Sequence, residues 1–287
     1  MKIAVFGATG QVATEIQRRA PPHITLEVIG RQTADFASPE NIANVTRALQ
    51  TDAVINAAAY TAVDKAEDES GLAHTVNGLS VAAMATECAT RALPLVHIST
   101  DYVFPGDGAE PWLPDATTGP LGTYGASKLA GEDAIRALTF PAAILRTSWV
   151  FSAHGNNFVK TMLRLGAERD RLTIVADQIG GPTPAADIAD ACFNIAERLI
   201  HGHKGGTYHF SGAPDVSWAD FAREIFQQSG LNPDVVDIPS SEFPTKAVRP
   251  LNSRLDCSTL EADFGIKRPD WRNGLRDVLR NLRTQSA

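Results

Sequence analysis

Short apolar runs alternate with longer stretches of helical spacing through the first half of the chain. Because strands that alternate with helices pair in parallel and are covered by helices on both faces, this order predicts a parallel sheet. We therefore expect an α/β fold built on a Rossmann-type doubly wound parallel sheet. The runs that predict strands are "KIAVF" from residue 2, "ITLEVI" from 24, "DAVINAA" from 52, "PLVHIS" from 94 and "AAILRTS" from 142.

One helix in this half has a marked start. Ser38 stands directly before Pro39. A serine N-cap followed by proline at the first helical position is typical of a helix N-terminus, because proline lacks the N–H that has no partner there. The sequence therefore predicts a helix from about Pro39 to Gln50.

After about residue 150 the pattern becomes less regular. Glycine and proline interrupt it in "DQIGGPTPAADIADACFNIAERL", and several prolines stand between Pro233 and Pro269. We expect a dinucleotide-binding domain over residues 1–150 and a second, smaller mixed α/β lobe for the substrate over 151–287. Part of residues 184–200 is expected to return to the first domain.

Composition and charge exclude several classes of protein. The chain has 287 residues, of which 44% are hydrophobic and 21% charged, as in soluble globular proteins. The net charge is −7 with both signs interspersed, so there is no cationic face for nucleic acid or a membrane. Three distant cysteines, Cys88, Cys192 and Cys257, lack metal-ligand spacing. We expect a cytoplasmic protein with no nucleic-acid or membrane partner.

The first predicted strand runs into a pattern of small residues. Gly7, Gly10 and Ala13 follow the strand and precede a helix. Small residues let the backbone approach a pyrophosphate, which the helix N-terminus then stabilises. The pattern predicts a dinucleotide site, with a plain tight turn as the alternative.

The ends of the next two strands supply further candidates. Arg31 follows the second strand, where a guanidinium could pair with a ribose 2′-phosphate, and Asp35 lies where an adenine edge would fall. Alternatively, Arg31 is an ordinary exposed arginine and Asp35 is an aspartate that forms a turn. After the third strand, the backbone at Asn56, Ala57 and Ala58 can pass close beneath a cofactor.

A tyrosine and a lysine stand four positions apart in "TYGASKLAGE". On a helix, Tyr124 and Lys128 would share one face, with their Cβ atoms roughly 5–6 Å apart. An ammonium this close to a phenol favours the phenolate form. Thr100 ends the fourth strand, where its hydroxyl could donate to a substrate carbonyl. The alternative for Tyr124 and Lys128 is an ordinary amphipathic helix, and the alternative for Thr100 is a turn at the strand end. Asn77 either supports this catalytic helix or is a satisfied core amide.

Several motifs together resemble a known family. Gly7, Gly10, "INAAA", "STDYVF" and "YGASK" resemble the extended short-chain dehydrogenase/reductase superfamily. Within it the chain resembles the dTDP-4-dehydrorhamnose reductase family over nearly its whole length. The resemblance implies that NADPH or NADH reduces the C4 ketone of dTDP-4-dehydro-L-rhamnose to dTDP-L-rhamnose, which serves polysaccharide synthesis. The motifs that carry it are "GQVA", "AAAYTAVDKAE", "STDYVFPGDGAEPW", "RTSWVF", "DQIGGPT" and "RPLNSRLD".

The resemblance also implies roles for particular residues. Thr100, Tyr124 and Lys128 form the catalytic triad, and Lys128 also binds the nicotinamide ribose. Arg249 contacts the diphosphate, or is instead a structural arginine that binds carbonyls. Cofactor contacts come from Gly7, Gly10, Gln11, Val12, Arg31, Asp35, Ala57, Ala58, Ala59, Tyr124 and Lys128, and the sugar pocket is lined by Thr61, Val63, Thr100, Tyr102 and Trp149.

Two alternatives to this reaction stay open. One is a reductase or epimerase of another nucleotide sugar, and the other is a non-catalytic NADP-binding regulatory subunit. Dehydratases of the superfamily carry an Asp-Glu pair after the catalytic threonine, whereas here Asp101 is followed by Tyr102. This difference favours simple reduction of a dTDP-sugar.

The resemblance raises one further expectation, about metal and assembly. Some members of the family join two subunits through magnesium bound by three glutamates. Here Glu15 holds the first place, Ala186 holds the second, and the closing helix contains no glutamate. One carboxylate binds a hard cation weakly. We expect Glu15 to be a solvated helix residue, no metal site, and a monomer or weak homodimer.

Overall fold

A six-stranded parallel sheet forms the larger part of the computed structural model, which describes residues 1–285. The strand order is β10-β5-β4-β3-β1-β2, and every pair is parallel. This sheet confirms the predicted α/β class, and all five predicted strands are present. The strands are β1 (Lys2–Phe6), β2 (Thr25–Ile29), β3 (Ala53–Asn56), β4 (Leu95–Thr100), β5 (Ala142–Thr147) and β10 (Gly205–His209).

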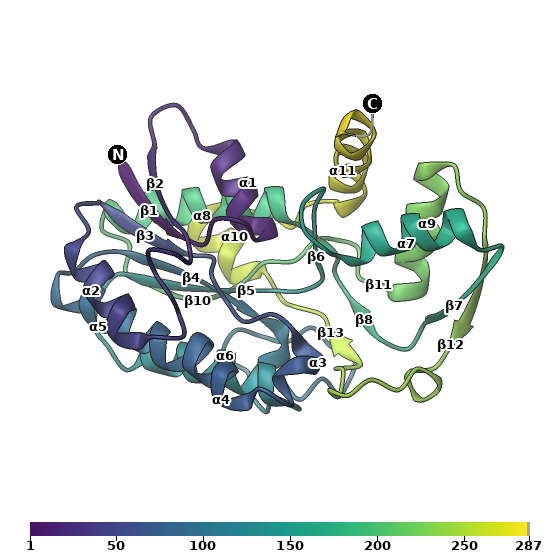
Figure 1. The fold of residues 1–287 in the computed structure, drawn as a ribbon, viewed down its shortest axis with the longest axis horizontal. Helices are drawn as coiled ribbons and strands as arrows, with labels where there is room; N and C mark the ends of the chain where they lie inside the picture. Colours follow the sequence, from purple (N-terminus) through teal and green to yellow (C-terminus); the bar gives the residue numbers. More distant parts are fainter. Residues whose placement is uncertain (286–287) are drawn as a thin grey trace.

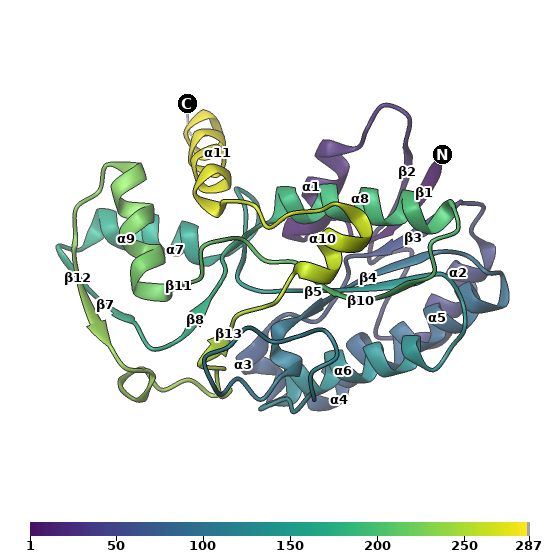
Figure 2. The same cartoon turned by 180° about the vertical axis from the view of Figure 1, so that it is seen from behind.

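Helices cover both faces of the sheet, as Figures 1 and 2 show. One face packs against α1 (Gln11–Arg19), α8 (Ala185–Ile200) and α10 (Ser258–Phe264). The other packs against α2 (Pro39–Ala48), α5 (Ser80–Thr90) and α6 (Thr123–Arg136). Shorter segments lie near α6, namely α3 (Val63–Ala66), α4 (Ser70–His74), the π-helical η1 (Thr75–Leu79) and the 3₁₀ turn η2 (Asp101–Val103).

The predicted start of α2 is confirmed. The helix begins at Pro39, and the hydroxyl of Ser38 accepts a hydrogen bond from the Asn41 N–H at 3.3 Å. The helix ends at Ala48, two residues before the predicted end.

A smaller mixed lobe lies beside the sheet, as predicted (Figure 1). Its apolar core gathers aromatic side chains, including Phe221 and Trp271. Its helices are α7 (Phe158–Glu168), α9 (Trp218–Ser229) and α11 (Trp271–Gln285), with the 3₁₀ turn η3 (Ser240–Glu242). Its short strands are β6 (Val150–Phe151), β7 (Arg171–Val175), β8 (Ile179–Gly180), β9 (Thr183–Pro184), β11 (Val216–Ser217), β12 (Asp234–Ile238) and β13 (Asn252–Ser253).

The predicted assignment of residues 151–287 to the second lobe needs a correction. Besides α8, which falls in the expected 184–200 segment, β10 pairs with β5 at the edge of the large sheet. α10 packs against β10 and α8. The return is longer than predicted because the open edge of β5 offers backbone groups that β10 pairs with, while α8 and α10 bury the sheet's apolar face.

No helix within residues 1–285 is long and apolar enough to cross a membrane. Cys88, Cys192 and Cys257 are all free thiols, and each is buried.

Candidate active site

Two elements bring the predicted catalytic residues together. Thr100 ends β4, and α6, which packs on this strand, carries Tyr124 and Lys128 in its first two turns. The Lys128 ammonium donates to the backbone oxygen of Ile98, on β4, at 2.7 Å. The three residues therefore meet at the carboxyl end of β4, the edge where parallel sheets bind ligands.

A carboxylate from another segment fixes the start of α6. Glu67, which follows α3, accepts hydrogen bonds from the Thr123 N–H at 2.8 Å and from the Thr123 hydroxyl at 3.0 Å. A carboxylate at a helix N-terminus satisfies free N–H groups and interacts well with the helix dipole. Sequence reasoning missed Glu67, because its partner lies 56 residues away.

The small residues of "TYGASKLAGE" let α6 pack closely. A Cβ at Gly125 would overlap the backbone oxygen of Tyr102, and one at Gly131 would overlap that of Asn77. The Asn77 amide donates to the Ser127 hydroxyl at 2.9 Å. Asn77 is also 1% exposed and accepts a hydrogen bond from the Tyr60 N–H at 2.8 Å, so it is a satisfied core amide that at the same time holds the helix carrying Tyr124 and Lys128.

The surroundings of Tyr124 differ from the sequence-based expectation. Burial raises the pKa of Tyr124 to about 12, while contact with the Thr100 hydroxyl acts in the opposite direction. In this arrangement desolvation outweighs the interactions that favour the phenolate, so the net shift of the Tyr124 pKa is upward. The Tyr124 ring packs edge-on against Tyr102, with centroids 5.5 Å apart.

Lys128 is 2% exposed and sits between backbone and side-chain partners. Its Nζ lies 2.7 Å from the Ile98 oxygen and 3.3 Å from Nε2 of His97. Burial lowers the pKa of Lys128 to about 8, although the negative charge of Glu132 acts in the other direction. Lys128 can therefore change its protonation state close to neutral pH.

A buried ion pair lies one helical turn beyond Lys128. Glu132 and Arg146 are both nearly inaccessible, with Arg146 Nη2 2.7 Å from Glu132 Oε2. The Ser99 hydroxyl, next to Thr100, donates to Glu132 Oε1 at 2.5 Å. These contacts fix α6 against β4 and β5, and none of them was predicted.

On the cofactor side, Gly7 has a backbone conformation that favours glycine. Its φ is +110°, and a Cβ there would lie 3.2 Å from the carbonyl carbon of Ala57. The end of β1 thus passes directly over the backbone of Ala57 and Ala58, which follow β3. This close approach, with α1 starting after Gly10, fits the dinucleotide cradle that the sequence predicts.

Gln11 and Val12, the first two residues of α1, differ from each other in their contacts. The Gln11 side chain accepts hydrogen bonds from Ser152 Oγ at 3.1 Å and from Asn157 Nδ2 at 2.9 Å. It therefore ties the helix N-terminus to the segment that follows β6. Val12 instead packs against the apolar core.

Arg31 and Asp35 lie close together after β2. Arg31 Nε is 3.8 Å from Asp35 Oδ1, and the Arg31 side chain is 85% exposed. An exposed guanidinium held only loosely is free to turn toward an anionic group.

The predicted sugar-pocket residues come from both lobes. Trp149 has a φ of +49°, and its ring stacks on Trp218 of α9 with centroids 3.6 Å apart. Trp218 in turn donates through Nε1 to the Gln178 side chain at 3.1 Å. Trp218 was not predicted, because nothing in its local sequence distinguishes it from a core tryptophan.

Arg249 lies against α3, close to the predicted Thr61 and Val63. Its Nη2 is 2.5 Å from Oδ2 of Asp64 on α3. Its Nη1 is buried and has no hydrogen-bond partner among the described residues. The structure therefore brings Arg249 to the segment that was predicted to line the sugar pocket.

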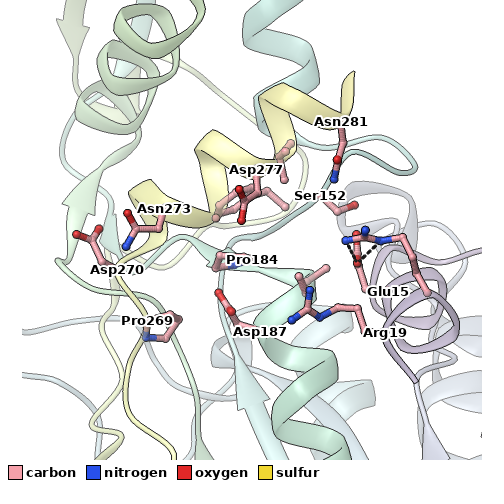
Figure 3. Close-up of a pocket in the computed structure, with 16 residues that line it drawn as sticks. Glu15, Arg19, Ser152, Pro184, Asp187, Pro269, Asp270, Asn273, Asp277 and Asn281 are labelled. Atoms are coloured by element: carbon pink, nitrogen blue, oxygen red, sulfur yellow. Dashed lines mark hydrogen bonds and ion pairs between the residues drawn. The ribbon is translucent and has the colours of Figure 1, made fainter. Parts of the chain in front are cut away.

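A separate pocket lies between α1, α8 and α11 (Figure 3), and Thr100, Tyr124 and Lys128 are not among the residues that line it. Glu15 lines this pocket, yet it is only 2% exposed and pairs with Arg18 at 2.9 Å and with His154 at 3.3 Å. The prediction that Glu15 is a solvated helix residue is therefore wrong, because the side chains of Arg18 and His154 cover its carboxylate. Asp187 and Asp277 also line the pocket, and burial raises the pKa of Asp187 to about 6.

The chain is similar to known proteins of one family in both sequence and structure. A family model described as the RmlD substrate binding domain matches residues 1–284. The chain is 43% identical to the dTDP-4-dehydrorhamnose reductase of Sinorhizobium fredii, with 97% of each chain covered. The structure of such a reductase from Clostridium acetobutylicum matches with a TM-score of 0.92 and 35% identity, covering 99% of this chain and 100% of that one. The Bacillus anthracis reductase, solved in complex with NADP, gives 0.91 at 35% identity, covering 98% of this chain and 99% of that one.

Proposed function

The chain belongs to the dTDP-4-dehydrorhamnose reductase family and has its reductase activity, and on this premise we propose how its residues perform the reaction. The observation that carries the proposal is the meeting of Thr100, Tyr124 and Lys128 at the end of β4. Hydride transfer to a ketone builds negative charge on its oxygen, which hydrogen-bond donors in a buried site stabilise.

In this proposal Thr100 and Tyr124 act on the C4 oxygen of the sugar. The Thr100 hydroxyl donates to that oxygen, and Tyr124 gives it a proton. A pKa of about 12 keeps the Tyr124 phenol protonated at neutral pH, which suits a general acid. Lys128 contacts the nicotinamide ribose with the N–H groups that Ile98 leaves free.

The cofactor cradle is proposed to consist of the glycine loop and the end of β3. The close approach of Gly7 to Ala57 and Ala58 fits a pyrophosphate that no side chain obstructs. When bound, the reduced nicotinamide supplies the hydride. We assign the ribose 2′-phosphate of NADPH to Arg31, whose exposed side chain makes NADPH the slightly better cofactor and leaves NADH usable.

For the dTDP-sugar we propose a pocket between the lobes. Thr61, Val63, Tyr102 and Trp149 contact the sugar. The buried Nη1 of Arg249, which lacks a partner among the described residues, supports a contact with the diphosphate. Asp64 would hold the guanidinium in place for that contact.

We also propose that the protein works in the cytoplasm, as a monomer or weak homodimer and without a metal. Three buried free thiols suit a reducing compartment. Within residues 1–285, no group of three or more metal-ligating side chains is placed to hold an ion.

A direct test incubates the protein with dTDP-4-dehydro-L-rhamnose and either NADPH or NADH. We expect absorbance at the reduced nicotinamide band to fall and NMR to identify dTDP-L-rhamnose as the product. A product with the other configuration at C4, or no oxidation of either cofactor, would contradict the proposal.

A further inference from the structure

Three buried polar side chains form a row beneath the proposed active site. Asn56 ends β3, His97 lies within β4, and Lys128 lies on α6. Asn56 Nδ2 is 3.0 Å from His97 Nδ1, and His97 Nε2 is 3.3 Å from Lys128 Nζ. Each of the three is at least 98% buried, so water does not complete their hydrogen bonds.

The backbone sets the direction of this row. Asn56 Oδ1 accepts the Ala58 N–H at 3.1 Å, which turns the amide nitrogen toward His97 Nδ1. Burial and the charge of Lys128 lower the pKa of His97, so its ring is neutral. A neutral imidazole has one lone pair and one N–H. Because Nδ1 accepts from Asn56, the hydrogen of His97 lies on Nε2.

The Nε2–H of His97 therefore points at Lys128 Nζ. A neutral amine has a lone pair that can accept this hydrogen, whereas an ammonium has only donors to offer. We propose that His97, oriented by Asn56, is a positioning residue that favours the neutral amine of Lys128 over its ammonium. The nearby Ile98 oxygen keeps its hydrogen bond from Nζ in either form.

The consequence for the reaction rests on the proposed function. After Tyr124 gives its proton to the C4 oxygen, the phenolate must regain one. Loss of a proton from the Lys128 ammonium supplies it, and the amine left behind accepts the hydrogen bond from His97. Lys128 then recovers its proton from water, so each turnover consumes one proton from the solvent.

Other charged groups around Lys128 do not remove this effect. Glu132, on α6, favours the ammonium, but its charge is shared with Arg146 on β5 and Arg136 on α6. Tyr124, on the same helix, is neutral at working pH. Glu132 thus opposes the effect of His97 on Lys128.

The proposal predicts how the pKa of Lys128 responds to two substitutions. In His97→Gln the amide oxygen can face the ammonium and accept from it. In Asn56→Ala, His97 is free to place its hydrogen on Nδ1, so that Nε2 accepts from Lys128. Each variant should raise the pKa of Lys128 by about one pH unit, a tenfold change in proton affinity.

The measurement is an NMR titration of the lysine side chains in the full chain, without added cofactor, with Lys128→Met assigning the signal. His209→Gln is the matched control, since His209 is equally buried but contacts Arg146 and Trp112 instead of Lys128. A pKa near 8 in the native protein that rises in both variants but not in the control supports the proposal.

An unchanged pKa in either folded variant, or an equal rise in the control, overturns the proposal. If one of the two variants does not fold, the pKa of Lys128 in the other variant still tests the proposal. Reductase activity measured on the native sample separates the two proposals. A shifted pKa in a native protein without activity would contradict only the proposed function, and an active protein with an unshifted pKa would contradict only the role of His97.

Discussion

Tyr124 and Lys128 lie on one side of α6, yet burial moves their pKa values in opposite directions. The phenol is pushed to about 12 and the ammonium down to about 8, because desolvation disfavours the charged form of each. The neutral phenol suits proton donation, and the lysine suits proton exchange. The protonation states of Tyr124 and Lys128 therefore depend on their burial as much as on their spacing along α6.

The lowered pKa of Lys128 has a consequence for stability. Below about pH 8 the folded protein carries a buried ammonium that costs free energy, and from about pH 8 to 10.5 the folded state loses this proton before the unfolded state does. The free energy of unfolding should therefore rise over this range, by up to about 3 kcal/mol relative to Lys128→Met. Denaturant unfolding of both proteins at several pH values checks this. An equal pH dependence in the two would contradict it.

Arg31 is expected to distinguish the two cofactors. Arg31→Ala removes a cation that only the 2′-phosphate of NADPH can use, so NADPH should bind about tenfold more weakly while NADH changes little. Fluorescence titration with both cofactors measures the dissociation constants. Arg47→Ala, which removes an exposed arginine paired with Glu87 on another helix, is the control. Equal losses for NADPH and NADH would show that Arg31 does not contact the phosphate.

Sequence reasoning identified residues whose role is local and missed those whose role depends on distant partners. Gly7 and the Tyr124–Lys128 pair lie in short local motifs that, taken together along the chain, could be found from the sequence. Glu67 and His97 could not, since Glu67 caps a helix 56 residues away and His97 bonds an asparagine 41 residues away. A buried histidine in an apolar strand carries no signal until the fold places Asn56 and Lys128 at its two nitrogens.

At the scale of elements, the position of α6 depends on a glycine. Gly125→Ala would place a Cβ against the Tyr102 backbone oxygen and force α6 away from η2. We expect a loss of about 2 to 3 kcal/mol in stability, together with a fall in turnover. Gly71→Ala, in α4, is the matched control because open space surrounds that position. Thermal unfolding and turnover should be measured for both, and equal behaviour of the two variants would contradict close packing as the reason for Gly125.

The elements themselves could mostly be predicted, with one informative exception. Each of the five strands from β1 to β5 contains a short apolar run, which is the pattern that predicts a buried strand. β10, with the sequence "GGTYH", has no such run, and its place in the sheet follows from pairing with the edge of β5. Edge pairing is a long-range property, so the return of β10 and α10 to the first lobe was missed.

At the scale of the whole molecule, the pocket between α1, α8 and α11 bears on assembly. Glu15 is covered by Arg18 and His154, and its carboxylate already has a cationic partner in Arg18 without a metal. We expect sedimentation and turnover to be the same with and without EDTA. Added magnesium is the control and should restore nothing. A dimer that dissociates on chelation, with activity falling in parallel, would show that metal joins two subunits.

If Tyr124 protonates the C4 oxygen, the Tyr124→Phe variant must lose turnover. The phenyl ring keeps the packing against Tyr102 while the proton donor is lost. With dTDP-4-dehydro-L-rhamnose and NADPH, kcat should fall by at least about 100-fold, while the dissociation constant for NADPH changes little. Tyr208→Phe, which removes a hydroxyl that donates to Asp263 on another segment, is the control and should retain native turnover. Near-native turnover of Tyr124→Phe would show that another group protonates the C4 oxygen.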